Sequence, residues 1–270
     1  MGSFSVRNTK EILRDPINMA FGLGFPIALL LLLTAIQANV PVEVFPVERL
    51  TPGIAMFGLS FVSLFSATLI AKDRSTAFLT RLLSSPLTAR DFILGYTLPL
   101  LPMCLIQSVV CYVTGFCLGL RPGWTVLAAL AALIPSNIFF ISLGLLCGSL
   151  FNDKQVGGIC GALLTNMAAL LSGTWFDLEM VGGPFLRVAE LLPFVHAVDA
   201  GRAALSGDWT NMVLHLLWTT GWAFVKPTTS TILSTNVEKN DVPQKFSGKV
   251  PRLPAAVRQG VLHGGPAGGE

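Results

Sequence analysis

The stretch FGLGFPIALLLLLTAIQA, residues Phe21–Ala38, contains no charged side chain and predicts a helix that crosses a membrane. An α-helix rises about 1.5 Å per residue, so roughly 20 apolar residues cover the hydrocarbon core of a bilayer. The composition of the chain agrees, because 52% of its 270 residues are hydrophobic and only 12% are charged, against about 25% charged in an average soluble domain. The sequence therefore indicates an integral membrane protein.

Five more apolar runs follow along the chain. Four are long enough to span a bilayer: Gly53–Ala71, Gly95–Gly119, Trp124–Phe151 and Val156–Trp175. The third of these needs a kink, which Pro135 would supply. The last run, Thr210–Val225, is shorter. We therefore expect an all-α integral membrane fold with six transmembrane helices over residues 1–225. Residues 226–270 are rich in Pro, Gly, Ser and Thr, which predicts an atypical, disordered tail.

The distribution of basic residues predicts the orientation. If the N-terminus is inside, 14 of the 18 Lys and Arg residues fall on the inner side, and cytoplasmic loops are enriched in these residues. Trp124, Trp175 and Trp209 lie at the outer ends of the predicted spans, where aromatic residues meet the membrane interface. Residues 1–225 carry equal numbers of acidic and basic side chains, so we expect the lipid bilayer as a partner and no nucleic acid.

A polar segment, AKDRSTAFLTRLLSSPLTARDF (Ala71–Phe92), separates the second and third spans. Its apolar side chains recur at helical spacing beside Arg81: Phe78, Leu79, Leu82 and Leu83. This pattern predicts an amphipathic helix at the inner surface. A second amphipathic piece, Asn8–Arg14, precedes the first span. Periodicity alone is equally satisfied by two helices that lie in the interface and anchor the bundle.

The segment between the fifth and sixth spans, Phe176–Trp209, is too polar to cross the membrane and too apolar to extend into water. We expect it to form outer re-entrant helices that fold back against the bundle. Its candidate functional residues are Pro193, His196, Asp199 and Arg202. We interpret His196 as a histidine on a helix surface, because no second His or Cys lies near it in sequence.

A few polar residues lie inside the predicted spans and are candidates for a transport pathway or a helix interface: Ser60, Ser63, Thr165, Asn166 and Ser172. Asn166 is the costliest to bury unpaired, so it either lines an accessible cavity or bonds across helices. No charged residue occupies the middle of a span, which disfavours an ion-coupled carrier and favours an amphipathic or apolar cargo. Three pairs of glycines four residues apart predict close helix packing: Gly115/Gly119, Gly144/Gly148 and Gly157/Gly161.

At this point four stretches of the sequence resemble a known family. RDPINMAFGLGFPIALLLL, FLTRLLSSPLTARDFILGY, SLFNDKQVGGICGALLTNMAALLSGTWFDL and LPFVHAVDAGRAAL look like the permease subunit of type-2 ATP-binding-cassette exporters. The sequence is most similar to the drug-exporter branch, over roughly residues 7–223.

The resemblance implies a six-helix domain that pairs with a second copy or a paralogue and works with cytosolic nucleotide-binding ATPase subunits. ATP and Mg would bind to that ATPase, and this chain would bind no cofactor. In the family the N-terminal amphipathic helix and the loop between the second and third spans touch the ATPase. The implied coupling surface comprises Phe78, Leu79, Arg81, Leu82 and Leu83. The implied location is the plasma membrane of a bacterium, as a multi-pass protein.

The chain contains no Gly-x-x-x-x-Gly-Lys-Ser/Thr loop, so ATP hydrolysis is expected in a partner chain and we do not expect an enzyme. The alternative class is an ATP-independent membrane carrier or a membrane assembly or scaffold protein. An intramembrane enzyme ranks last, because neither a His-Glu-x-x-His motif nor paired aspartates occur in the spans.

Overall fold

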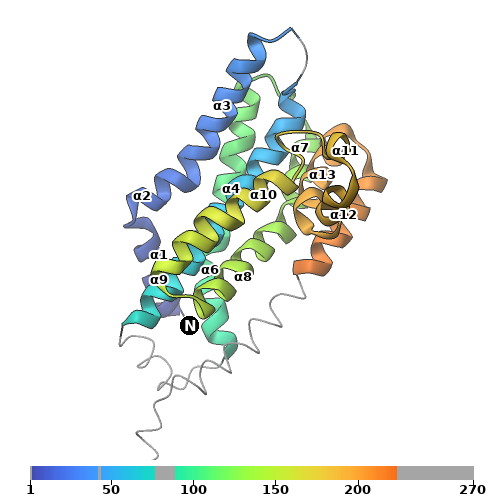
Figure 1. Ribbon diagram of the computed structural model, residues 1–270. Helices are drawn as coiled ribbons and strands as arrows, with labels where there is room; N and C mark the ends of the chain where they lie inside the picture. The colour runs from blue at the N-terminus through green and yellow to red at the C-terminus, as the bar shows by residue number, and fades with distance from the viewer. Residues whose placement is uncertain (1, 42–43, 77–88, 224–270) are drawn as a thin grey trace, which may run out of the picture.

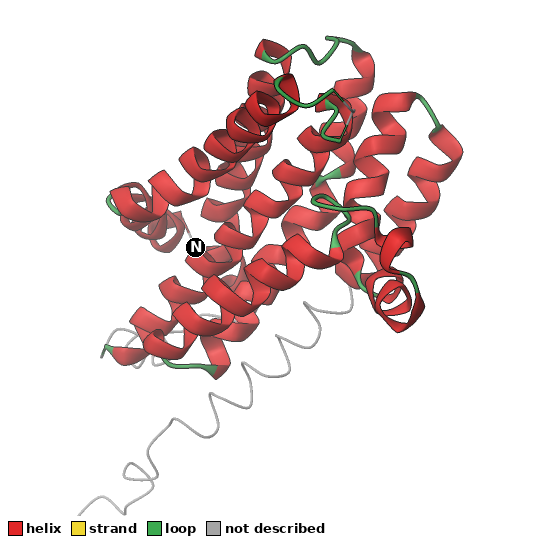
Figure 2. Cartoon of the chain, turned by 45° about the horizontal axis from the view of Figure 1, so that its top comes forward, coloured by secondary structure: helices red, strands yellow, loops and turns green. Residues whose placement is uncertain are grey.

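The computed structural model describes residues 2–41, 44–76 and 89–223 (Figure 1). Within these ranges the regular elements are all helices and no strand occurs (Figure 2), which confirms the all-α prediction. The predicted tail, residues 226–270, and the predicted amphipathic stripe of residues 78–83 lie outside the described residues.

The helices fall into three consecutive groups. The first group leads into the bundle: α1 (Gly2–Leu13), α2 (Pro16–Met19), the π-helical η1 (Ala20–Gly24) and α3 (Phe25–Ala38). The second forms its centre: α4 (Val47–Ser75), α6 (Ala89–Cys117), α7 (Trp124–Ala132) and α8 (Ile134–Leu150). The third comprises α9 (Asp153–Val156), the π-helical η2 (Gly157–Leu164), α10 (Thr165–Leu171), α11 (Leu178–Val181), α12 (Gly183–Leu191), α13 (Pro193–Ser206) and a last helix over 209–223.

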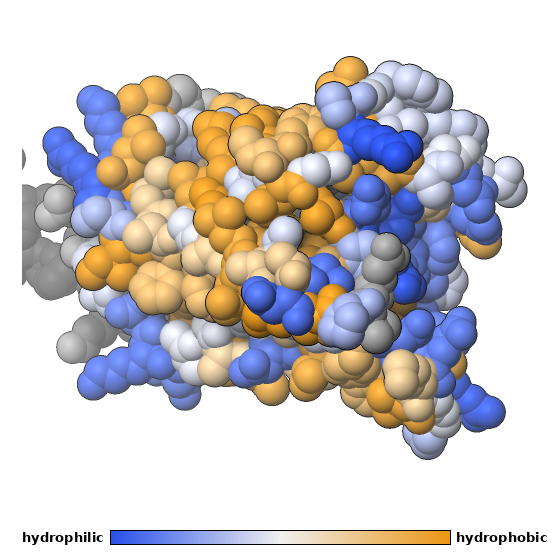
Figure 3. Space-filling view, turned by 90° about the horizontal axis from the view of Figure 1, so that it is seen from above, coloured by the Kyte–Doolittle hydropathy of each residue, from blue (hydrophilic) through white to orange (hydrophobic). Residues whose placement is uncertain are grey.

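Four stretches of the described chain are long and apolar enough to cross a membrane: Pro16–Ala38, Val47–Ser75, Ile93–Cys117 and Trp124–Leu150. They coincide with the first four predicted spans. The fifth and sixth predicted spans form helices, α9 to α10 and 209–223, but are not among these four. Seen from above, apolar side chains cover the middle of the molecule and hydrophilic side chains gather toward its edges (Figure 3).

Helix α4 is the centre of the bundle and is buried along almost its whole length. It contacts α3, α6, α8, η2 and α13, which surround it in the ribbon view (Figure 1). A helix that is apolar on all sides is stable only when protein or lipid covers every face. We call the end of the bundle that carries α1 the α1 end, and the end that carries the loop between α3 and α4 the far end.

Proline breaks the fourth span where the sequence predicts a kink. Helix α7 ends at Ala132, and α8 begins at Ile134 with Pro135 in its first turn. Proline has no backbone N–H to donate and is tolerated at the first turn of a helix, where no partner is required. The predicted kink is therefore confirmed as a break into two helices.

Helices α4 and α8 pack at backbone distance. A Cβ atom added at Gly144 would lie 2.2 Å from the carbonyl oxygen of Ser63, and one added at Gly148 would lie 2.3 Å from that of Ala67. Both contact positions advance by four residues in the same direction, so the two helices run parallel. The close packing predicted for Gly144/Gly148 is confirmed.

The other two glycine pairs do not form such an interface. Gly157 faces open space, and Gly161 meets only the side chain of Leu64 at 3.4 Å. Gly115 approaches Thr51, but Gly119 has a φ of 109° and lies just past the end of α6. Within the described chain, Gly157/Gly161 and the second glycine of Gly115/Gly119 therefore do not pack closely against another helix, because the spacing alone does not say which face meets a neighbour.

We expect Gly144→Ala to lower stability by about 1–3 kcal/mol, because the added methyl group meets a backbone carbonyl that no rotamer change can move. The shift of the thermal unfolding midpoint in detergent measures this loss. Gly24→Ala is the matched control, since a Cβ atom there has nothing within 4 Å and alanine favours a helix over glycine. Equal midpoints for both variants would contradict the close contact.

Candidate functional site

The predicted coupling surface lies within residues 77–88, outside the described residues. Its role therefore stays a prediction for all five of its residues: Phe78, Leu79, Arg81, Leu82 and Leu83. The structure does describe what holds the two ends of this connector. The connector leaves α4 after Thr76 and enters α6 at Ala89. The first candidate site is therefore the α1 end of the bundle, where α1 lies against α4 and α6.

Asp73, in the last turn of α4, is the centre of this site and is only 2% exposed. Arg7 of α1 donates two hydrogen bonds to its carboxylate, Nη2 to Oδ1 at 2.7 Å and Nη1 to Oδ2 at 3.2 Å. The hydroxyl of Tyr96 on α6 donates a third bond to Oδ2 at 2.7 Å. Donating these bonds to the Asp73 carboxylate raises the pKa of Arg7. A buried carboxylate is thus paired and bonded from two other helices, as burial of a charge requires.

Two further α1 residues fix the same helix to α6. The ring of Phe4 lies edge-on to Tyr96 with centroids 5.0 Å apart. A Cβ atom at Gly95 would lie 2.2 Å from the Phe4 ring, so only glycine admits this approach. Asn8 is fully buried and donates its amide to the Gly95 carbonyl at 3.0 Å. Helix α1 is therefore bound to the bundle by one face.

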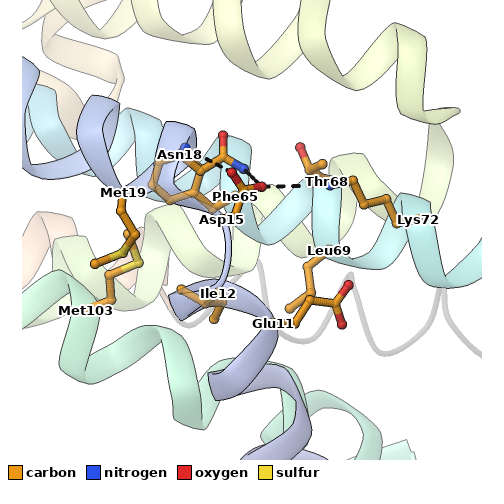
Figure 4. Close-up of a pocket in the computed structure, with 10 residues that line it drawn as sticks. All are labelled: Glu11, Ile12, Asp15, Asn18, Met19, Phe65, Thr68, Leu69, Lys72 and Met103. Atoms are coloured by element: carbon orange, nitrogen blue, oxygen red, sulfur yellow. Dashed lines mark hydrogen bonds and ion pairs between the residues drawn. The ribbon is translucent and has the colours of Figure 1, made fainter.

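A small cleft of about 30 Å³ opens beside this site, between α1, α2, α4 and α6 (Figure 4). Its apolar side chains are Ile12, Met19, Phe65, Leu69 and Met103. Asp15 caps α2 through the backbone N–H of Asn18 at 3.2 Å and lies 3.9 Å from the ammonium of Lys72. The cleft is too small for a drug-sized molecule, and two of its polar residues, Asp15 and Asn18, bond to each other in the turn between α1 and α2.

The far end contains a larger cavity of about 630 Å³, bordered by the start of α4, the 173–177 turn, α12, α13 and His215. Three of the predicted outer residues, His196, Asp199 and Arg202, line it together, and Pro193 begins α13 as a buried residue. Trp124 and Trp209, both predicted at outer ends of spans, stack with centroids 4.5 Å apart.

Arg202 ties α13 to the far end of the bundle. It donates to Asp199 Oδ1 at 3.2 Å, to the Gly173 carbonyl at 2.8 Å and to the Arg49 carbonyl at 3.3 Å. Burial lowers the pKa of Arg202, and Asp199 partly opposes that shift. The predicted fold-back of this segment against the bundle therefore has a specific anchor.

His196 is half-buried and paired, which corrects its interpretation as a lone surface histidine. Its Nδ1 lies 2.8 Å from Nδ1 of His215, and its Nε2 lies 2.7 Å from the Glu190 carbonyl. A carbonyl only accepts, so His196 Nε2 carries a hydrogen and donates it to the Glu190 carbonyl, while the two Nδ1 atoms share the other hydrogen bond. Sequence analysis missed this pair because its members lie 19 residues apart on different helices. No three metal-ligating side chains gather anywhere in the described ranges.

Four of the five predicted pathway or interface residues are buried: Ser60, Ser63, Thr165 and Ser172. Ser60 donates to the Phe57 carbonyl at 2.6 Å, and Ser63 faces α8 at Gly144. Asn166 instead lies exposed on α10. It has no hydrogen bond to the rest of the described chain, so its side chain is accessible from outside a single copy of the chain.

The family model described as ABC-2 type transporter matches residues 2–206 of this chain. The chain belongs to the ABC-2 type transporter family. The family assignment and the apolar helices make it a multi-pass membrane protein and a transport permease rather than an enzyme.

Two curated relatives agree with this assignment. "Putative transport permease ycf38" of Porphyra purpurea is 25% identical over 222 residues, covering 77% of this chain and 75% of the relative. The protein of the same name in Pyropia yezoensis is 24% identical with the same coverage. Both relatives are algal, so they lend no support to the expected bacterial plasma membrane. No solved structure matches the chain.

We expect His215→Phe to loosen α13, because it removes the hydrogen bond to His196 while keeping a ring of similar size. One neutral hydrogen bond contributes about 1 kcal/mol, so hydrogen exchange of residues 193–206 should rise about fivefold. The matched control is Leu214→Phe at the preceding position, where the side chain is 63% exposed. Unchanged exchange in His215→Phe would show that the histidine pair does not hold the helix.

Proposed function

We propose that this permease is the membrane subunit of an ATP-driven exporter, with six membrane-spanning helices and the N-terminus inside. Cytosolic nucleotide-binding ATPase subunits, which bind ATP and Mg, would contact the connector and α1. A second copy or a paralogue would complete the pathway for an amphipathic or lipophilic cargo. The fifth and sixth spans would be α9 to α10 and the helix that starts at residue 209.

The observation that carries this proposal is the attachment of α1 to both helices that flank the connector. A permease without an engine of its own needs a surface that receives motion from a partner and passes it to the spans. Helix α1 meets α4 at Asp73 and α6 at Tyr96, so it is placed to move with both flanking spans.

Two features of the described residues support an amphipathic or lipophilic cargo. Charged side chains of the central helices lie near their ends, as Asp73 does on α4 and Asp91 on α6. An ion-coupled carrier would place carboxylates at the middle of its spans. The far-end cavity of about 630 Å³ is in the size range of pockets for drug-sized ligands, about 300–1,000 Å³, and its charged lining, which includes Asp199 and Arg202, suits the polar part of an amphipathic cargo.

The first experiment is affinity purification of the tagged chain from its native membrane in mild detergent, followed by mass spectrometry. Recovery of an ATPase that carries a phosphate-binding loop is the expected result. Repeated recovery of the intact permease without any such ATPase would contradict the proposal and favour an ATP-independent carrier or scaffold.

The double variant Leu82→Asp with Leu83→Asp should lose most transport while the protein still inserts in the membrane, because two charges interrupt the predicted apolar contact with the ATPase. ATP-dependent efflux from vesicles, normalised to the amount of permease, measures the effect. Thr80→Asp with Ser84→Asp adds the same charge outside the predicted stripe and serves as the control. Full efflux by the leucine variant would remove these residues from the coupling surface.

A further inference from the structure

We propose that Asp73 is a positioning residue that makes α1, α4 and α6 move as one body during transport. The unit it forms with Arg7 and Tyr96 is called the Asp73 joint below. The inference rests on the proposed ATP-driven function, because it assigns the residue that passes the motion of the ATPase to the spans.

The first argument is the cost of separating the three helices. Asp73 is almost fully buried, and its three hydrogen bonds come from Arg7 of α1 and Tyr96 of α6. Moving either helix away from α4 leaves a buried carboxylate short of donors, which is far less favourable than losing an exposed ion pair. The three helices therefore have one favourable arrangement at this point rather than a continuous range.

The second argument is position along the chain. Asp73 lies three residues before Thr76, the last described residue before the connector. Tyr96 lies within two turns of the start of α6, where the chain leaves the connector. The two helices that flank the connector, α4 and α6, are thus held by the same carboxylate. A displacement applied at the connector or at α1 reaches α4 and α6 together instead of bending one of them.

The third argument is that the joint continues into the rest of the bundle. Arg74, the next residue, donates to the carbonyls of Gly148 and Ser149 at the end of α8. Helix α8 is in turn packed on α4 at Gly144 without room for a side chain. Motion that arrives at Asp73 therefore extends along α4 and α8 toward the far end.

A plain structural clamp would hold the same helices together, so the test must separate stability from coupling. The complex with the co-purified ATPase is prepared with Asp73→Asn in a Cys117→Ser background. A fluorescent thiol label is placed at Met180→Cys on α11, where the side chain is 85% exposed at the far end. The two quantities measured on each sample are ATP hydrolysis and the ATP-dependent change in label fluorescence.

The expected result is that Asp73→Asn keeps most ATP hydrolysis while the fluorescence change per ATP hydrolysed falls about tenfold. This is the order of magnitude expected when hydrogen bonds to a charged group are weakened. Adding Arg7→Gln should restore part of the response, because a Gln–Asn pair bonds without an unpaired charge. Lys72→Gln is the control, since Lys72 is half-exposed and lies 3.9 Å from its partner. A parallel fall in hydrolysis and fluorescence, or no fall in either, would overturn the proposal.

Two further measurements keep the proposal testable in every case. Should Asp73→Asn fail to fold, Tyr96→Phe removes only the hydroxyl and keeps the ring against Phe4, and it should lower the fluorescence response while sparing hydrolysis. Should no ATPase co-purify, the proposed function fails. The joint itself is then tested by hydrogen exchange of α1, which must be faster in Asp73→Asn than in Lys72→Gln, and equal rates would overturn it.

Discussion

The contact between the backbone of α4 and the glycines of α8 determines the geometry of the whole bundle. Hydrophobic burial does not draw helices together inside lipid, so close van der Waals packing has to do so. Gly144 and Gly148 allow α8 to approach the carbonyls of Ser63 and Ala67 directly. Around this parallel pair, α3, α6, η2 and α13 complete the cover of α4, and the two candidate sites lie at its two ends.

The two ends of α4 are held by different chemistry. At the α1 end, the buried carboxylate of Asp73 is shared between a guanidinium and a phenol. At the far end, Arg202 binds two backbone carbonyls and a carboxylate, and a hydrogen-bonded histidine pair fastens α13 to the last helix. Among the described residues, charged contacts are thus confined to the ends, and the middle of the bundle is held by close packing and by neutral hydrogen bonds, such as that from Ser66 to the Ile141 carbonyl.

The sequence predicts those features that depend on a short stretch of chain. The length of an apolar run predicts the first four spans, and the missing N–H of Pro135 predicts the break before α8. Contacts between residues far apart in the chain cannot be predicted from such local patterns. Arg7 and Asp73 lie 66 positions apart, and His196 and His215 occupy separate helices. The three glycine pairs show the same limit, because spacing identifies a face but not the neighbour that covers it.

The parallel course of α4 and α8 has an electrostatic consequence. Both helices end at the α1 end, so their dipoles add there and place partial negative charge on the final carbonyls. Arg74 binds two of these carbonyls on α8, and Lys72 lies in the last turn of α4. Both are among the basic residues that predict the orientation of the chain. Arg74 and Lys72 therefore also offset the partial negative charge at the ends of α8 and α4. Replacing Arg74 would disturb the end of α8 even where the orientation of the chain in the membrane is unchanged.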